Sequence, residues 1–211
     1  LLFSATYPLN IEKLASKVMI RPHLIEAEHQ HNENTIRQLL CQIHDKSKRT
    51  DGLVGLFQKF NPDSALVFCN TKKLTEDVAL ELRNLGFSSI ALHGDMEQKD
   101  RNQILVKFAN RSLSVLVATD VAARGLDIES LDLVVNYHLP RDPEVHTHRI
   151  GRTGRAGNKG LACSLFHESE EYKIEILEKT LSQPIDRTFV DSVEKDFTPT
   201  QPNMTTLQIE G

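Results

Sequence analysis

Residues 148–155 read His-Arg-Ile-Gly-Arg-Thr-Gly-Arg, which places three arginines within eight residues. Arg152 and Arg155 are three positions apart, so on a helical turn both guanidinium groups lie on one side. Each guanidinium is permanently charged and offers a planar fork of N–H donors, which suits a chain of phosphates. Glycines between the arginines let the backbone approach a ligand closely. The pattern indicates a polyphosphate-binding segment. A basic surface loop with ordinary salt bridges is the alternative.

Size and charge restrict the class of protein. The chain has 211 residues, 39% of them hydrophobic, and a net charge of −4. This fits one α/β domain of roughly 150 residues with flanking segments, in which any polyanion site is local. We find no apolar run near the ~20 residues of a membrane span and no signal peptide. Cys41, Cys69 and Cys163 form no paired motif. We therefore expect a cytoplasmic protein with reduced, buried thiols and no metal site.

Apolar strand patterns alternate with helical patterns along most of the chain. We expect strands at 35–44, 65–69, 89–92, 114–118, 131–136 and 160–166, and helices at 10–19, 48–60, 71–85, 97–108, 119–123 and 170–181. Such alternation predicts a mostly parallel sheet covered by helices on both faces. Residues 182–211 lose the rhythm and contain three prolines, which is typical of a tail or linker.

Small polar, glycine or charged residues follow the predicted strands. Residues 70–73, 93–95, 119–120 and 124–127 come after three of them, and the arginine cluster comes after the strand at 131–136 and a loop. Ligands of parallel α/β sheets bind beyond the carboxyl ends of the strands. We therefore expect these segments to share one rim of the sheet. Unrelated solvated loops are the weaker explanation.

Five segments in this order carry a family resemblance: Ser4-Ala5-Thr6, residues 66–71, Gln98-x-x-Arg101, residues 118–127 and residues 148–155. Together they resemble motifs III, IV, IVa, V and VI of the DEAD-box RNA helicases. The resemblance implies a RecA-like, three-layer α/β/α sandwich. Residues 68–73, 92–98, 142–146 and 204–211 are similar to the bacterial DbpA subgroup of that family.

The resemblance also implies a domain organisation. These helicases pair two RecA-like domains, and no G-x-x-x-x-G-K-[ST] phosphate loop occurs in this sequence. Residues 1–30 would be the last strand and helix of the first domain with the interdomain linker, and residues 31–182 the second domain. Residues 183–211 would lead to a further RNA-binding domain.

The resemblance assigns ATP-side roles to several residues. Arg152 and Arg155 correspond to arginine fingers, which offset charge on the transferring γ-phosphoryl group. Asp127 and Gly125 would bind the nucleotide, with a turn cap as the alternative for Asp127. His148 would contact the first domain and Ser4-Ala5-Thr6 across the cleft, unless it is an ordinary surface histidine.

RNA-side roles fall on residues that hold sugar and phosphate without reading bases. They are Thr71, Gly94, Gln98, Arg101, Thr119 and Arg124. We expect Gln98 to orient Arg101, and Phe68 to pack beneath the arginine segment. Asn70 and Thr71 could instead cap a helix, and Arg101 could pair with Asp95 or Asp100. His146 has no expected role.

The implied activity is ATP-dependent unwinding of short RNA duplexes, with ATP and Mg²⁺ bound mainly by the first domain. The implied RNA is 23S ribosomal RNA during large-subunit assembly, and the implied state is a monomer without membrane contact. The isolated chain would not hydrolyse ATP. Alternatives are the motor half of another superfamily-2 translocase and a non-catalytic RNA-binding module. The latter would have been favoured by loss of Asp127, Arg152 or Arg155, and all three are present.

Overall fold

A computed structural model describes residue 17 and residues 36–124, 126, 131–154 and 159–190. The strands are β1 (Ile36–Ile43), β2 (Ala65–Phe68), β3 (Ser89–Leu92), β4 (Val115–Ala118), β5 (Leu133–Asn136), β6 (Gly160–His167) and β7 (Asp186–Phe189). They form one sheet in the order β3-β4-β2-β5-β6-β1-β7, and every neighbouring pair is parallel. The predicted parallel sheet is confirmed.

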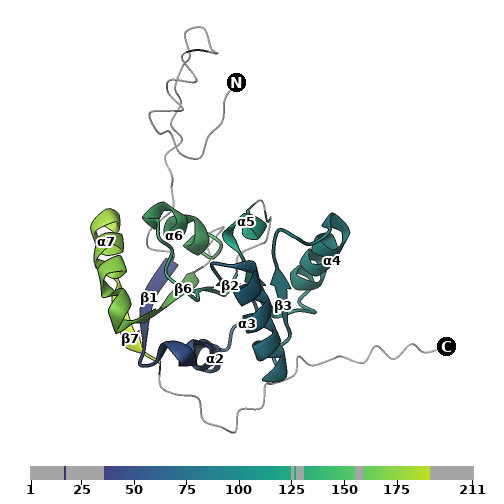
Figure 1. The fold of residues 1–211 in the computed structure, drawn as a ribbon, viewed down its shortest axis with the longest axis horizontal. Coiled ribbons are helices and arrows are strands. Elements are labelled where there is room, and N and C mark those ends of the chain that lie inside the picture. The colour runs from purple at the N-terminus through teal and green to yellow at the C-terminus, as the bar shows by residue number, and fades with distance from the viewer. Residues whose placement is uncertain (1–16, 18–35, 125, 127–130, 155–158, 191–211) are drawn as a thin grey trace, which may run out of the picture. The chain divides into compact units, whose positions relative to one another are not determined.

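Helices cover both faces of this sheet. They are α2 (Arg49–Phe60), α3 (Lys72–Asn84), α4 (Gln98–Ala109), α5 (Asp120–Ala123), α6 (Pro143–Ile150) and α7 (Glu171–Leu181), with short 3-10 turns η2 (Lys46–Lys48) and η3 (Glu168–Glu170). Figure 1 shows α4, α5, α6 and α7 on one side of the strands and α2 on the other. The architecture is a three-layer α/β/α sandwich of the RecA-like type.

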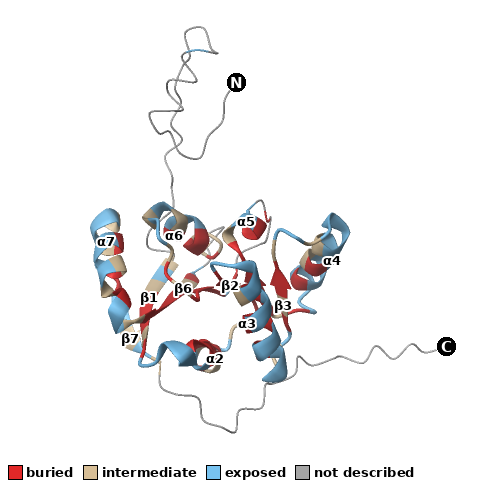
Figure 2. Cartoon of the chain, viewed as in Figure 1, coloured by how far each residue is buried: buried red, intermediate tan, exposed pale blue. Residues whose placement is uncertain are grey.

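The sheet is apolar because it is buried on both faces. All four residues of β2, β4 and β5 are buried. Leu66 and Phe68 pack towards α4 and α5, whereas Ala65 and Val67 pack towards α2 and α3. A third cluster, which includes Leu40 and Phe166, lies under α7. Figure 2 shows this burial as red strands between helices with pale blue outer faces. Strands buried on both faces have continuous apolar sequences, which is why they could be predicted.

The tail prediction needs one correction. We predicted residues 183–211 as a tail, but Asp186–Phe189 form β7, which pairs with β1 at the edge of the sheet. β7 is short, its side chains are mostly exposed, and polar residues dominate it, so it lacks the hydrophobic pattern of the inner strands. Residues 191–211, and all of the predicted helix at 10–19 except Lys17, lie outside the described residues.

A second correction concerns residues 143–147, which fall in the loop that we expected between the strand at 131–136 and the arginine cluster. They belong to α6 (Pro143–Ile150), with Asp142 as its N-cap and Pro143 in the first turn. The remaining predicted helices and strands between residues 36 and 181 occur within one or two residues of the expected bounds.

The cysteines match their prediction: Cys41, Cys69 and Cys163 are free and buried. Burial raises the pKa of the Cys69 thiol to about 12, although nearby Arg149 opposes the shift. Among the helices that the structure describes, none has the length and apolar character needed to cross a membrane.

Gly160, the first residue of β6, is packed against the segment that follows α6. A β-carbon on Gly160 would lie 2.3 Å from the backbone nitrogen of Gly154 and 2.4 Å from Thr153 Oγ1. Backbone atoms at such distances cannot move aside as a flexible side chain can. The arginine segment therefore depends on the absence of a side chain at position 160.

We predict that Gly160→Ala lowers the free energy of unfolding by roughly 1–3 kcal/mol, because it overpacks a backbone contact. Gly94→Ala is the matched control, since a β-carbon at Gly94 has no atom within 4 Å. Its effect should stay within about 0.5 kcal/mol. Urea denaturation of both variants measures the difference, and equal midpoints would contradict the packing argument.

Candidate functional site

Three neighbouring strands, β2, β4 and β3, end beside the predicted RNA-binding residues. Thr71 follows β2 and caps α3, where its hydroxyl oxygen accepts a hydrogen bond from the Leu74 amide at 3.2 Å. Thr119 follows β4 and caps α5 through the Ala122 amide at 3.4 Å. A hydroxyl that accepts in this way still has its own proton to donate. Both threonines can therefore cap a helix and donate to a phosphate oxygen.

Arg101 joins α4 to α5. Its Nη2 donates to the carbonyl of Ala122 at 2.6 Å and lies 3.4 Å from that of Arg124. The considered pairing of Arg101 with Asp95 does not occur, because Lys72 forms the ion pair with Asp95. These contacts place the N-terminal parts of α3 and α4, together with α5, along one rim.

The expectation that Gln98 orients Arg101 is wrong for the described residues. The Gln98 amide donates to Asn102 Oδ1 at 2.9 Å, one turn further along α4. Gly94 is exposed, and the space where a β-carbon would stand is open. Its backbone is therefore accessible, as a backbone contact with a polyanion requires.

Arg149, which we did not single out, is the most connected side chain of the site and is 2% exposed. It forms a bidentate ion pair with Asp120 through Nε at 2.6 Å and Nη2 at 2.8 Å. Nη1 donates to Asn136 Oδ1 and to the His138 carbonyl, both at 3.0 Å, and Nη2 donates to Asn70 Oδ1 at 3.3 Å. These five contacts match the five N–H donors of a guanidinium. Arg149 is thus held in one orientation.

Phe68 completes the surroundings of Arg149. The guanidinium carbon lies 5.1 Å from the centre of the Phe68 ring, a cation–π distance. The prediction that Phe68 packs beneath the arginine segment is confirmed. Asn70 is exposed and bonds to Arg149, whereas the adjacent Thr71 is the residue that caps α3.

Arg152 lies away from the rim, contrary to the expectation that all these segments share it. Thr153 forms a parallel bridge with Leu131, two residues before β5 begins, and its hydroxyl donates to the Leu131 carbonyl. The Arg152 guanidinium donates to the Leu126 carbonyl at 3.1 Å. The eight residues of α6 rise about 12 Å, close to the ~13 Å length of β5. α6 therefore runs from the carboxyl ends of the strands towards their amino ends.

The other predicted site residues have different outcomes. His148 is exposed on α6 and Arg124 is exposed at the end of α5. The predicted ATP ligands Gly125, Asp127 and Arg155, and the predicted interdomain residues Ser4, Ala5 and Thr6, lie outside the described residues. Their roles stay predictions.

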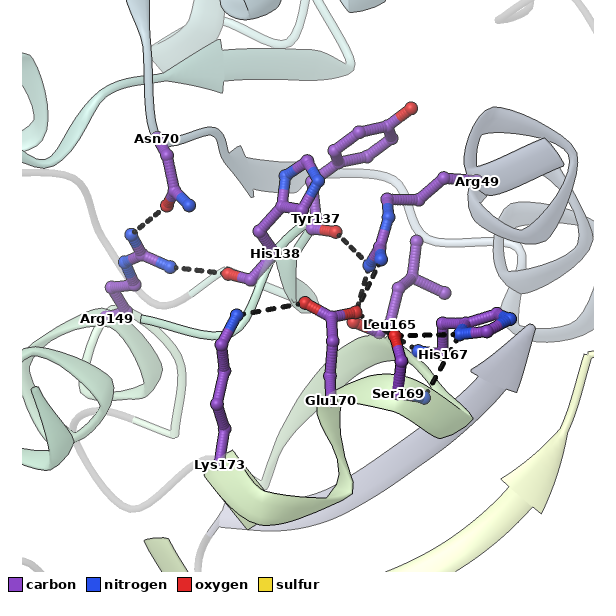
Figure 3. Close-up of polar contacts among 10 residues, drawn as sticks. All are labelled: Arg49, Asn70, Tyr137, His138, Arg149, Leu165, His167, Ser169, Glu170 and Lys173. Carbon is purple, nitrogen blue, oxygen red and sulfur yellow. Dashed lines mark hydrogen bonds and ion pairs between the residues drawn. The ribbon is translucent and has the colours of Figure 1, made fainter. Parts of the chain in front are cut away.

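A second buried arginine fixes the loop between β5 and α6. Arg49 Nη1 donates to the carbonyls of Tyr137 at 2.8 Å and Leu165 at 2.9 Å, and Nη2 pairs with Glu170 at 2.6 Å. Figure 3 shows Arg49 and Arg149 binding the successive carbonyls of Tyr137 and His138 from opposite sides. Two charged side chains therefore hold this loop in place.

Burial and the contacts of Arg49 shift the pKa values of Glu170 and His138. Burial alone would raise the pKa of Glu170, but the hydrogen bond and charge of Arg49, with Lys173, lower it to about 2. Burial, and then the charge of Arg49, lower the pKa of His138 to about 4. At neutral pH Glu170 is ionised and His138 is neutral, so the loop carries no additional positive charge beside the two arginines.

A pocket of about 350 Å³ lies elsewhere, between the loop at 139–143 and α7. Leu139, Pro140, Arg141, Pro143, Tyr172, Lys173, Ile176 and Leu177 line it. It contains none of the predicted site residues. No group of three or more histidine, cysteine or acidic side chains suited to a metal gathers within the described ranges.

The sequence contains a weak indication that Arg149 and His146, for which we predicted no role, are buried. The buried residues of α6 are His146, Arg149 and Ile150, which share one face at spacings of three and four. Ile150 marks the core-facing side of this helix, so polar residues one turn before it are also expected inside. Their partners Asp120 and Asn136 could be identified only from the tertiary structure.

Comparison with known proteins shows the family of this chain. The profile of the helicase conserved C-terminal domain matches residues 45–157. The ATP-dependent RNA helicase DbpA of Escherichia coli is 48% identical over 185 residues, which cover 86% of this chain and 39% of DbpA. The DEAD-box helicase CshA of Bacillus cereus is 39% identical over 89% of this chain and 36% of CshA. The chain thus spans less than half the length of these relatives.

Solved structures agree with the sequence comparison. A DEAD-box protein from Methanococcus jannaschii superposes with a TM-score of 0.68 at 38% identity, over 88% of this chain and 50% of that protein. Saccharomyces cerevisiae Dbp5 bound to RNA and ADP BeF3 superposes with a TM-score of 0.78 at 32% identity, over 90% of this chain and 51% of Dbp5. The chain belongs to the helicase conserved C-terminal domain family, as the C-terminal domain of a DEAD-box RNA helicase.

We predict that Arg149→Met lowers the free energy of unfolding by about 3–5 kcal/mol, because it leaves Asp120 and Asn136 without their buried partner. Arg111→Met is the control, since Arg111 forms a solvent-exposed ion pair with Asp63. Its effect should be below about 1 kcal/mol. Chemical denaturation checks both values, and similar losses in the two variants would contradict the central position of Arg149.

Proposed function

We propose that this chain is the second half of an ATP-dependent RNA helicase that couples ATP hydrolysis to local unwinding of RNA duplexes. The observation that carries the proposal is the linkage of the predicted RNA rim to the predicted arginine finger. Asp120, at the start of α5, binds Arg149, and Leu126, beyond the end of α5, accepts a hydrogen bond from Arg152. One continuous segment therefore positions groups for both ligands.

On the RNA side, the rim suits a sugar–phosphate backbone. The hydroxyls of Thr71 and Thr119, the backbone at Gly94 and the guanidinium of Arg101 offer donors to phosphate oxygens. Arg124 is exposed beside them and adds positive charge, and Gln98 stands at the first turn of α4. Such contacts favour RNA of any sequence and weaken steeply with salt.

On the ATP side, we propose that Arg152 and Arg155 act as arginine fingers and that Asp127 and Gly125 bind the nucleotide. The phosphate loop and most Mg²⁺ ligands would belong to a first domain of the same polypeptide. The arginines reach the γ-phosphate only when the two domains close around ATP and RNA. His148 would then contact Ser4-Ala5-Thr6, which reports nucleotide binding to this domain.

The similarity to DbpA supports a narrower biological proposal. We propose 23S ribosomal RNA as the partner and large-subunit assembly as the process, with a monomeric protein acting in the cytoplasm. Specificity for that RNA would come from a domain beyond residue 211, because rim contacts to phosphates read no bases.

In the complete two-domain protein, we expect Arg152→Lys to lower kcat by at least ~10³-fold, because lysine retains the charge but loses the planar fork. The RNA concentration for half-maximal ATPase should stay unchanged. Arg111→Lys, on the exposed surface, is the matched control. Normal turnover by Arg152→Lys would contradict the finger assignment.

For the isolated chain, we expect no ATP hydrolysis and weak RNA binding that weakens further with salt. Arg101→Ala combined with Thr119→Ala should lower the affinity for single-stranded RNA about tenfold, through loss of two phosphate contacts. Fluorescence anisotropy at two salt concentrations measures this effect. Unchanged binding would contradict the RNA rim, and robust hydrolysis would contradict the two-domain mechanism.

A further inference from the structure

His146 is a buried histidine of α6 for which the sequence indicated no role. It is 1% exposed and lies between two amide side chains from different strands. Its Nδ1 is 3.3 Å from Asn136 Nδ2 of β5, and its Nε2 is 3.0 Å from Gln38 Oε1 of β1. The ring therefore joins the first strand of the sheet to the strand that supports Arg149.

Hydrogen-bond chemistry determines which atoms donate. A guanidinium only donates, so the Asn136 atom bound to Arg149 must be the carbonyl oxygen Oδ1. The other atom is then the amide nitrogen, which donates to Ser164 Oγ at 2.9 Å and to His146 Nδ1. Because Nδ1 accepts, the proton of a neutral ring is on Nε2, from which it is donated to Gln38. Each polar atom in this hydrogen-bond network is therefore either a donor or an acceptor, without conflict.

This hydrogen-bond network stabilises one orientation of the Asn136 amide. A rotation of the amide by half a turn would place its NH₂ group against the Arg149 guanidinium, donor against donor. It would also place a carbonyl oxygen against the lone pair of His146 Nδ1. His146 thus disfavours the rotated amide from the nitrogen side of Asn136, in the buried interior where unmatched polar groups are costly.

We propose that His146 is a positioning residue that acts through Asn136 to hold Arg149, and through Arg149 to hold Asp120 at the start of α5. Its importance for RNA-stimulated hydrolysis rests on the proposed helicase function. The orientation of Arg149 does not depend on that proposed function, and it can be measured in this domain alone.

The neutral state of the ring is part of this role. Gln38 from β1 and Asn136 from β5 contact His146 without charge, and Arg149 from its own helix is the charged neighbour. Burial, and then the charge of Arg149, lower the pKa of His146 to about 4. Protonation would turn Nδ1 into a donor facing the Asn136 NH₂ group and would add a positive charge beside Arg149. The network is therefore intact at neutral pH and fails only in acid.

The first test is nuclear magnetic resonance of this chain. Long-range ¹H–¹⁵N correlation should show His146 as the Nε2–H tautomer from about pH 7.5 down to about pH 5, without protonation. The Arg149 Nε–H should give a slowly exchanging signal that is lost in His146→Phe and restored in His146→Gln, whose amide oxygen can accept again. An Nδ1–H tautomer, or titration near pH 6.5, would overturn the proposal even if the variants failed to fold.

The second test measures RNA-stimulated ATPase in the complete two-domain protein. His146→Phe should raise the RNA concentration for half-maximal activity about tenfold, which corresponds to about 1.4 kcal/mol and to the loss of one hydrogen bond. His146→Gln should restore the wild-type value. His44→Phe is the matched control, because exposed His44 only stacks on Phe189.

The outcomes distinguish a failure of the proposed helicase function from a failure of the positioning role of His146. Absence of RNA stimulation in the wild-type protein contradicts the proposed function and leaves the resonance result standing. Normal RNA dependence and an unchanged Arg149 signal in His146→Phe overturn the positioning role. A loss of stability without a change in RNA dependence also overturns it, because that pattern belongs to a core histidine with no influence on the site.

Discussion

The bidentate ion pair between Arg149 and Asp120 is the interaction on which both predicted ligand sites depend. It joins α6 to α5, and because the Arg149 side chain is buried, its charge would be costly without a partner, so the two helices cannot shift independently. The remaining donors of Arg149 hold the end of β5 and the residue that precedes the cap of α3. One side chain thereby sets the relative positions of three helices, and a ligand that binds any of them meets an arrangement already formed.

Arg49 extends the same principle to the other half of the sheet. Arg49 donates to the Tyr137 carbonyl, which is next to the His138 carbonyl bound by Arg149. It also pairs with Glu170, whose lowered pKa keeps the carboxylate ionised in mild acid. The loop after β5 is thus fixed from both sides, although it is irregular backbone. In the proposed helicase, such rigidity allows closure on ATP to carry the RNA rim along with the arginine finger.

The sequence was sufficient for most of the fold because the inner strands are apolar throughout and turn residues separate them. It was insufficient for β7, whose exposed polar residues carry no period, and for α6, which is short and carries buried polar residues. The residues that follow the strands predicted a shared rim, but the displacement of Arg152 from it follows from the length and direction of α6. Arg149 and His146 have only their spacing from Ile150 as a signal in the sequence, because their partners come from distant strands.

The pairing of β1 has a consequence for how the protein is made. β1 bonds only to β6 and β7 within the described sheet, and both strands lie more than a hundred residues further along the chain. At ribosomal speeds of about 5–20 residues per second, β1 waits on the order of 10 s for its first partner. During that time Leu40 is without the later residues of its cluster, which include Leu139, Phe166 and Ile174, although α2 can already cover the opposite face of β1. The nascent chain is therefore vulnerable to aggregation until nearly all of this domain has left the ribosome.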